Sequence, residues 1–112
     1  MRIGYEVLRL LLLVSVAPIA VAGGHSDAAP SGKVVFEASC ANCHTGGFGG
    51  FFSGAPKVGD QADWAPLIVK GVDKLTANTL AGIGDMTARG GCESCTDEEI
   101  AAAVAYMVEQ SR

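Results

Sequence analysis

The sequence predicts a small all-α domain, and three features of the chain support this. Apolar residues recur near the C-terminus at helical positions i, i+3, i+4, i+7 and i+8. No stretch alternates apolar and polar residues as a half-buried strand does. Residues 23–112, which follow an apolar N-terminal segment, number 90 and suffice for one domain. The C-terminal stripe consists of Ile100, Ala103, Val104, Met107 and Val108.

The N-terminal segment has the features of a cleaved export signal. Arg2 and Arg9 precede an uncharged run that ends in the small residues Ala20-Val21-Ala22. A retained membrane anchor is the competing interpretation, but the run is shorter than the ~20 residues a membrane span needs. We therefore expect a periplasmic protein with no stable membrane insertion after cleavage. The expected division is a signal peptide at 1–22, a flexible leader at 23–31 and a domain at 32–112.

The charge of the mature chain limits its partners. Residues 23–112 hold six Lys or Arg against eleven Asp or Glu, a net charge of −5. This charge argues against nucleic acid or an anionic membrane surface as a partner, and mildly favours a basic docking patch on the protein that exchanges electrons with the chain.

The domain begins with a helix that leads into a cysteine motif. From Gly32, the residues Val35, Phe36 and Cys40 lie on one helical face. Cys40-Ala41-Asn42-Cys43-His44 then has the spacing typical of covalent c-type haem attachment. Residues i and i+3 share a helix face, so both sulfurs can form thioethers with one haem. The histidine that follows them can bind the iron.

The middle of the chain predicts one loop and two short helices. Residues 46–54 contain five glycines and three phenylalanines, which indicates a loop round a haem edge. A phosphate-binding loop is the alternative, but no predicted strand precedes the segment and it contains no Gly-Lys-Ser/Thr. Asp63 is the expected N-cap of a helix that ends near Gly71. Asp73 is the expected cap of a second helix that ends before Gly82.

Residues 82–91 contain four glycines and one methionine, which predicts an irregular loop. Met86 is therefore the expected second axial ligand, because a thioether pairs with histidine on haem iron. Met107 is the alternative, but it lies on the apolar stripe of the last helix and is more simply a core residue. That helix begins with a capping box, in which Thr96 is the N-cap and Glu99 is N3.

A second cysteine pair, Cys92 and Cys95, has no histidine after it and cannot attach a second haem. Two interpretations remain open. The pair can form a disulfide in an oxidising compartment, where it braces the methionine loop. It can also join Cys40 and Cys43 in a four-cysteine zinc site, although the gap between the pairs is long for that and His44 would be left unused.

Several stretches together resemble the class I c-type cytochromes, in particular the cytochrome c-five subgroup. The most specific is Arg89-Gly90-Gly91-Cys92-x-x-Cys95-Thr96-Asp97-Glu98-Glu99-Ile100. The others are Gly32-Lys33-x-x-Phe36, Cys40-x-x-Cys43-His44, Gly54-Ala55-Pro56-Lys57, Gly59-Asp60-x-Ala62-Asp63-Trp64-Ala65-Pro66 and Gly82-Ile83-Gly84-x-Met86. The resemblance implies about four short helices wrapped around one covalent haem c.

The resemblance also implies roles for individual residues. His44 and Met86 would bind the iron, and Cys92 and Cys95 would form a disulfide. The Pro56 carbonyl would accept a hydrogen bond from His44, and Trp64 would lie near a haem propionate. Phe36 and Tyr106 would pack where the first and last helices cross. This chain departs from the family pattern at Thr87, where proline is frequent, and in a longer Phe48–Phe52 segment.

The resemblance implies a one-electron carrier and not an enzyme. Its partners would be redox proteins, for example a membrane quinol-oxidising complex and a terminal reductase or oxidase, and the protein would be a monomer or weak dimer. A haem enzyme or gas-binding sensor is the alternative, and it would require a labile sixth ligand. A zinc-binding module is a third possibility.

Overall fold

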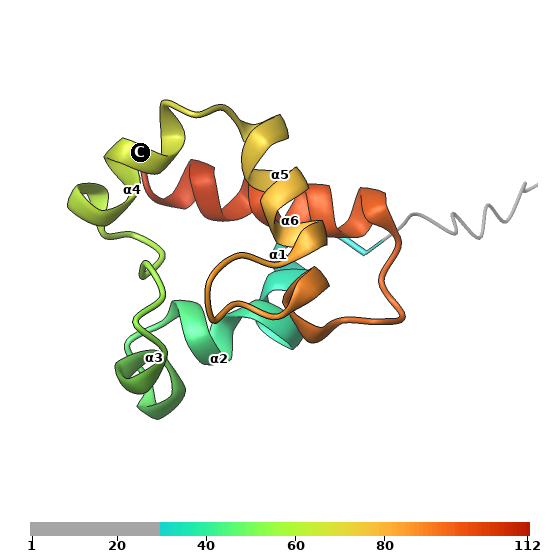
Figure 1. Ribbon diagram of the computed structural model, residues 1–112, viewed down its shortest axis with the longest axis horizontal. Coiled ribbons are helices and arrows are strands. Elements are labelled where there is room, and N and C mark those ends of the chain that lie inside the picture. Colours follow the sequence, from blue (N-terminus) through green and yellow to red (C-terminus); the bar gives the residue numbers. More distant parts are fainter. Residues whose placement is uncertain (1–29) are drawn as a thin grey trace, which may run out of the picture.

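The computed structural model describes residues 30–112, so the expected signal peptide and most of the leader lie outside the described residues. Figure 1 shows a helical domain in which α6 runs across the molecule. Helix α1 crosses α6, and α5 packs on it as well. The elements are α1 (Gly32–Val35), the π-helical turn η1 (Phe36–Cys40), α2 (Ala41–His44), α3 (Phe48–Ser53), α4 (Gln61–Ile68), α5 (Val72–Ala81), the 3-10 turn η2 (Ala88–Gly91) and α6 (Asp97–Gln110).

The all-α prediction is confirmed. Within residues 30–112 the only β-type pairing is an isolated bridge between Ile83 and Met86. No helix in that range has the length and apolar character required to cross a membrane.

Helix α6 is the centre of the core and agrees with the sequence prediction. Thr96 Oγ1 accepts a hydrogen bond from the Glu99 N–H at 3.2 Å, and the Glu99 carboxylate accepts one from the Thr96 N–H at 2.8 Å. These two bonds satisfy N–H groups that a helix start leaves without partners. All five residues of the predicted stripe, from Ile100 to Val108, are buried.

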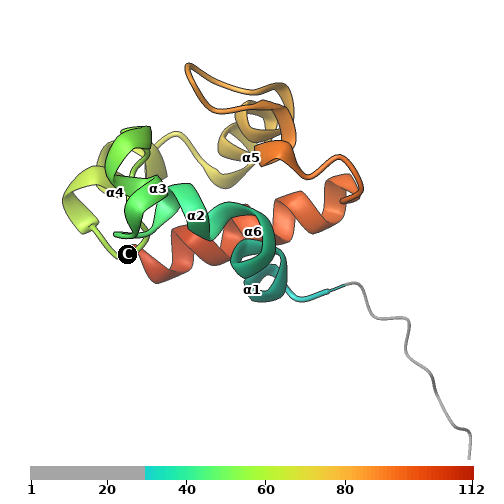
Figure 2. The same ribbon diagram turned by 90° about the horizontal axis from the view of Figure 1, so that it is seen from below.

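The stretch from Gly32 to His44 is a single helical run made of α1, η1 and α2. Ser31 caps it, and the widened π turn ends at Cys40, the first motif cysteine. Phe36 packs on Tyr106 of α6 with ring centroids 5.3 Å apart. Because this run is anchored on α6, its far end holds the cysteine motif at a defined place in the domain (Figure 2).

Two predicted helix caps are wrong. Helix α4 is capped by Asp60 and not by Asp63, because the Asp60 Oδ1 accepts from the N–H groups of Ala62 at 3.0 Å and Asp63 at 3.2 Å. Helix α5 is capped by Gly71 at φ 87°, a conformation that suits glycine, and Asp73 lies in its first turn instead.

The expected loop at residues 46–54 contains a helix. Residues Phe48–Ser53 form α3, which lies against α2 and ends at Gly54 in the left-handed conformation. This helix adds to the four that were expected. Its three phenylalanine rings are exposed to solvent, although an apolar residue normally turns inward.

Candidate functional site

A cavity of about 410 Å³ opens between α2, α4, α5 and the loop after α5. Its volume falls in the range of cofactor pockets, and its lining is predominantly apolar. Six residues selected from the sequence line it, namely Cys40, Cys43, His44, Pro56, Trp64 and Met86. Residues that lie up to 46 positions apart are thus brought to one site, while Cys92 and Cys95 lie outside it.

One hydrogen bond to the ring orients the His44 imidazole, and a second one holds its backbone. Its Nδ1 lies 2.8 Å from the Pro56 carbonyl oxygen. A carbonyl only accepts hydrogen bonds, so Nδ1 must carry a proton, and the neutral imidazole then has its lone pair on Nε2. The His44 carbonyl in turn accepts from the Val58 N–H at 2.9 Å. A buried imidazole with a fixed ring and a free Nε2 has the form of a metal ligand.

The two motif cysteines are unpaired and lie one helical turn apart at the cavity wall. Cys40 is buried and Cys43 is exposed. Burial raises the pKa of the Cys40 thiol, and the neighbouring Cys43 raises it further. Two thiols on one helix face, followed at once by His44, fit a covalently attached haem.

Trp64 lies in the wall of the cavity with only 4% of its surface exposed. Its indole N–H donates to the Lys57 carbonyl at 2.8 Å. Because this N–H is already engaged, the indole cannot donate it to a haem propionate as well. The expected position of Trp64 near a propionate stays a prediction. The bond also anchors the chain next to Pro56, whose carbonyl orients His44.

Met86 comes to the cavity on a tight turn. The backbone groups of Ile83 and Met86 bond each other in both directions, at 2.9 and 3.1 Å. Gly82, at φ 83°, packs so closely on the returning chain that a Cβ there would lie 3.0 Å from the Met86 carbonyl. Met107 also lines the cavity, but it is fixed within α6 as part of the core.

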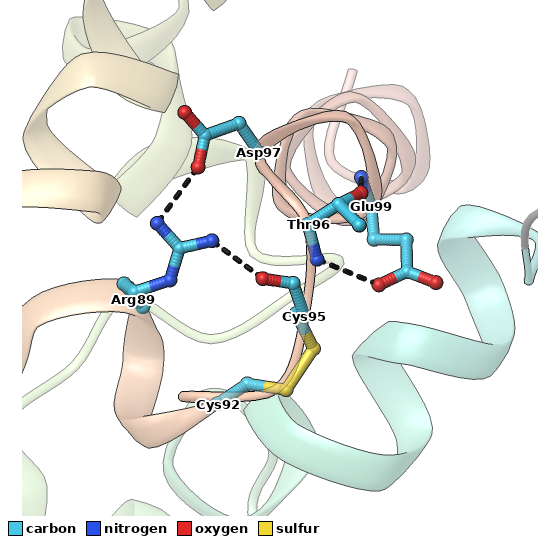
Figure 3. Close-up of polar contacts among 6 residues, drawn as sticks. All are labelled: Arg89, Cys92, Cys95, Thr96, Asp97 and Glu99. Atoms are coloured by element: carbon cyan, nitrogen blue, oxygen red, sulfur yellow. Dashed lines mark hydrogen bonds and ion pairs between the residues drawn. A yellow bond between two sulfur atoms is a disulfide. The ribbon is translucent and has the colours of Figure 1, made fainter.

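The chain after Met86 is tied to the start of α6, as Figure 3 shows. Cys92 and Cys95 are joined by a disulfide. Arg89 donates to the Asp97 carboxylate at 2.7 Å and to the Cys95 carbonyl at 2.5 Å. Arg89 is the one non-glycine residue of the described chain with positive φ, 61°, a conformation that costs free energy and is held by these contacts.

The sequence analysis named Arg89 within the stretch that resembles the family but assigned it no role. The signal available was its position three residues after Met86 and directly before Gly90-Gly91.

The zinc interpretation is not supported by the described part of the chain. Residues 30–112 contain no group of three or more His, Cys, Asp or Glu side chains placed to hold a metal ion. Two of the four cysteines are already consumed by the disulfide.

Comparison with known proteins agrees with the geometry of the site. Residues 27–107 match a family model described as "Cytochrome C oxidase, cbb3-type, subunit III". A relative from Chlorobaculum thiosulfatiphilum, named cytochrome c-555, is 48% identical over 88 residues, which cover 75% of this chain and 98% of the relative. A relative from Azotobacter vinelandii, named cytochrome c5, is 38% identical over 81 residues, which cover 70% of this chain and 93% of the relative.

Two solved structures have the same fold. A chain in the crystal structure of an electron transfer complex of nitrite reductase with cytochrome c superposes with a TM-score of 0.66 at 38% identity, covering 74% of this chain and 96% of the other. A mono-heme ferrocytochrome c from Shewanella putrefaciens superposes with a TM-score of 0.60 at 34% identity, with the same coverage of both chains.

Proposed function

Because this chain belongs to the class I c-type cytochromes of the cytochrome c-five kind, we propose that it passes single electrons between redox proteins with His44 and Met86 as its iron ligands. The chain carries one covalently bound haem c, as its family does. When bound, the haem iron supplies a one-electron couple whose potential depends on its ligands and surroundings. Cys40 and Cys43 are the proposed attachment residues.

The observation that carries this proposal is the shared cavity wall. The two cysteines, the oriented His44 and the loop-borne Met86 all face one cavity of mostly apolar lining. In our proposal His44 binds through Nε2, since Nδ1–H is engaged by the Pro56 carbonyl at 2.8 Å. That hydrogen bond increases the electron density on the ring and holds its plane. Two protein ligands leave no position open for a substrate, and we therefore propose a carrier and not an enzyme.

The proposed partners are redox proteins, a donor and an acceptor. A structurally similar chain was crystallised in an electron transfer complex with nitrite reductase, which supports docking to a protein as the mode of use. We further propose that residues 1–22 direct export and are removed, so that the mature protein works in the periplasm as a monomer or weak dimer.

The test is an absorption spectrum of the holoprotein in both redox states, with and without carbon monoxide. We expect covalently held low-spin haem that does not bind the gas readily when reduced. High-spin iron, or rapid gas binding by the wild type, would contradict the carrier and favour a gas sensor or haem enzyme.

Matched variants then identify the sixth ligand. Met86→Leu keeps the side-chain volume but removes the sulfur, so it should give high-spin iron, bind carbon monoxide and lower the reduction potential. Met107→Leu, at the other methionine of the cavity, should change none of these. If Met107→Leu produced the high-spin form instead, the assignment of Met86 would be wrong.

A further inference from the structure

Helix α3 presents an exposed aromatic surface next to the cysteine motif. Phe48, Phe51 and Phe52 are 85%, 76% and 71% exposed. The rings contact each other edge to face, with centroids 5.0 Å apart for Phe48 and Phe52 and 5.1 Å for Phe51 and Phe52. We call these three side chains the α3 aromatic surface. Their mutual contact makes one continuous apolar patch.

The orientation of α3 is the reverse of what the hydrophobic effect favours. Its inward face is made of glycine, and a Cβ on Gly50 would overlap the Thr45 carbonyl oxygen of the chain after α2. Gly49 packs on Asn42 in the same way. Only glycine permits this close approach, so the helix is seated with its small residues inward and its rings outward.

Polar contacts hold α3 in that orientation. Ser53 Oγ donates to the Cys43 carbonyl at 3.1 Å, and the Lys57 ammonium donates to the Gly50 carbonyl at 2.9 Å. The rings are therefore displayed on a helix that is anchored on α2, the helix of the haem cysteines (Figure 1). Cys43 itself is exposed. The α3 aromatic surface is thus carried by a helix that packs directly on the helix of cofactor attachment.

The segment that carries this surface contains no acidic residue, although the mature chain as a whole is acidic. No Asp or Glu occurs between Glu37 and Asp60, and the only Lys in that segment, Lys57, is occupied by the Gly50 carbonyl. A partner that covers the rings therefore meets no acidic side chain from this segment and no unpaired lysine from it. The matching surface is apolar and uncharged.

The size of the surface distinguishes a transient partner from a permanent one. Three rings of roughly 200 Å² each, exposed to the extent given above, present about 450 Å². Covered by an equal area, they bury roughly 900 Å² in total, below the ~1,200 Å² of stable complexes and in the range of electron-transfer encounters. A stable dimer through this surface alone is therefore not expected.

We propose that the α3 aromatic surface docks an apolar, uncharged face of the redox protein that exchanges electrons with this chain. The proposal rests on the carrier function proposed above and names the contact through which it works. The exposed rings, the glycine face and the packing of α3 on α2 then have one explanation: a rigid contact surface on the helix next to the one that attaches the cofactor.

Electron self-exchange tests this without a known partner, because a second copy of the chain presents the same apolar face. In a mixture of oxidised and reduced holoprotein, one electron passes from the reduced copy to the oxidised one, and nuclear magnetic resonance line broadening gives the rate. The reaction has no driving force, so a shift in reduction potential does not change it. Phe51→Ser combined with Phe52→Ser should slow it by about tenfold or more, and the ratio to wild type should be the same at low and high salt.

Val69→Ser is the matched control, since Val69 is 84% exposed but belongs to the end of α4 and not to α3. It should leave self-exchange unchanged, and all three proteins should react with hexacyanoferrate at similar rates. An unchanged rate in the phenylalanine variant, or an equal loss in Val69→Ser, would refute the proposal.

Two further outcomes would overturn it in favour of another occupant. Sedimentation that shows a stable wild-type dimer, lost in the phenylalanine variant, would make this a permanent interface between copies. Binding of the wild type, but not the variant, to neutral phosphatidylcholine vesicles would make it a lipid contact. A low-spin spectrum together with an unaffected self-exchange rate would refute the docking surface while leaving the carrier function intact.

Discussion

The close crossing of α1 and α6 depends on the absence of a side chain at Gly32, and Gly32→Ala tests this dependence. Gly32 begins the helical run that ends in the cysteine motif. A Cβ at this position would overlap the Ala102 carbonyl oxygen in α6 and would lie 3.2 Å from the Ala103 nitrogen. Both are backbone atoms in the middle of a helix, so neither can move aside as a flexible side chain would. The added methyl group must push the two helices apart.

The magnitude follows from opposing effects. Overpacking of a tight contact lowers the free energy of unfolding by about 1–3 kcal/mol, and the upper half of that range applies because the added methyl group overlaps backbone atoms. Alanine has a higher helix propensity than glycine, which offsets up to about 1 kcal/mol of this loss. The net loss is about 2 kcal/mol, and at roughly 4–8 °C per kcal/mol for a domain of this size the midpoint should fall by about 8–16 °C.

The assay is thermal unfolding of the oxidised holoprotein, followed by circular dichroism. Gly46→Ala is the control, because a Cβ there has no atom within 4 Å and its φ is not positive; it should shift the midpoint by no more than a few degrees. A fall of less than about 4 °C for Gly32→Ala, or an equal fall for both variants, would refute the close helix crossing.

Two other variants test contacts that hold the ends of the site. Thr96→Ala removes the acceptor for the Glu99 N–H and should cost about 1 kcal/mol in chemical unfolding, whereas Thr96→Ser should retain most of it; equal losses would mean that the cap is not responsible. Arg89→Gln removes the ion pair with Asp97 and the bond to the Cys95 carbonyl. These partners are partly exposed, so stability should fall by only about 0.5–1 kcal/mol, but the chain that follows Met86 loses its tie to α6. We therefore expect high-spin iron to appear at a lower temperature in Arg89→Gln than in the wild type. The control is Arg112→Gln, which removes the pair that Arg112 forms with Glu109 at 3.7 Å. If high-spin iron appeared at the same temperature in both variants, Arg89 would not position the loop.

The parts of the fold predicted correctly are those encoded by neighbouring residues. The capping box at Thr96, the buried stripe from Ile100 to Val108 and the end of α5 at Gly82 each depend on residues within a few positions of one another. Local spacing therefore predicted them directly. The motif Cys40-x-x-Cys43-His44 belongs to the same class, since one helical turn is enough to bring its groups together.

The errors arose where two local signals competed. Asp60 and Asp63 are both suitable caps, and only the observed path of the chain after Gly59 decides that Asp60 accepts the N–H groups. The glycine-rich segment at 48–53 has low helix propensity by itself. It is nevertheless helical in the folded domain, where it packs on α2. That contact is so close that only glycine fits on the inward face of the helix.

The amino-acid sequence alone predicted a helical, haem-binding chain, and it identified six of the residues that line the cavity. Tertiary structure decided what those residues contact. The bond from His44 Nδ1 to the Pro56 carbonyl spans 12 positions and was expected only from the family resemblance, and the bond from the Gly59 N–H to the buried Ser111, which spans 52, was not expected at all. The outward direction of the α3 rings and the tie of Arg89 to the start of α6 also depend on packed neighbours. Such contacts depend on where separate elements meet, and no spacing within one segment encodes that.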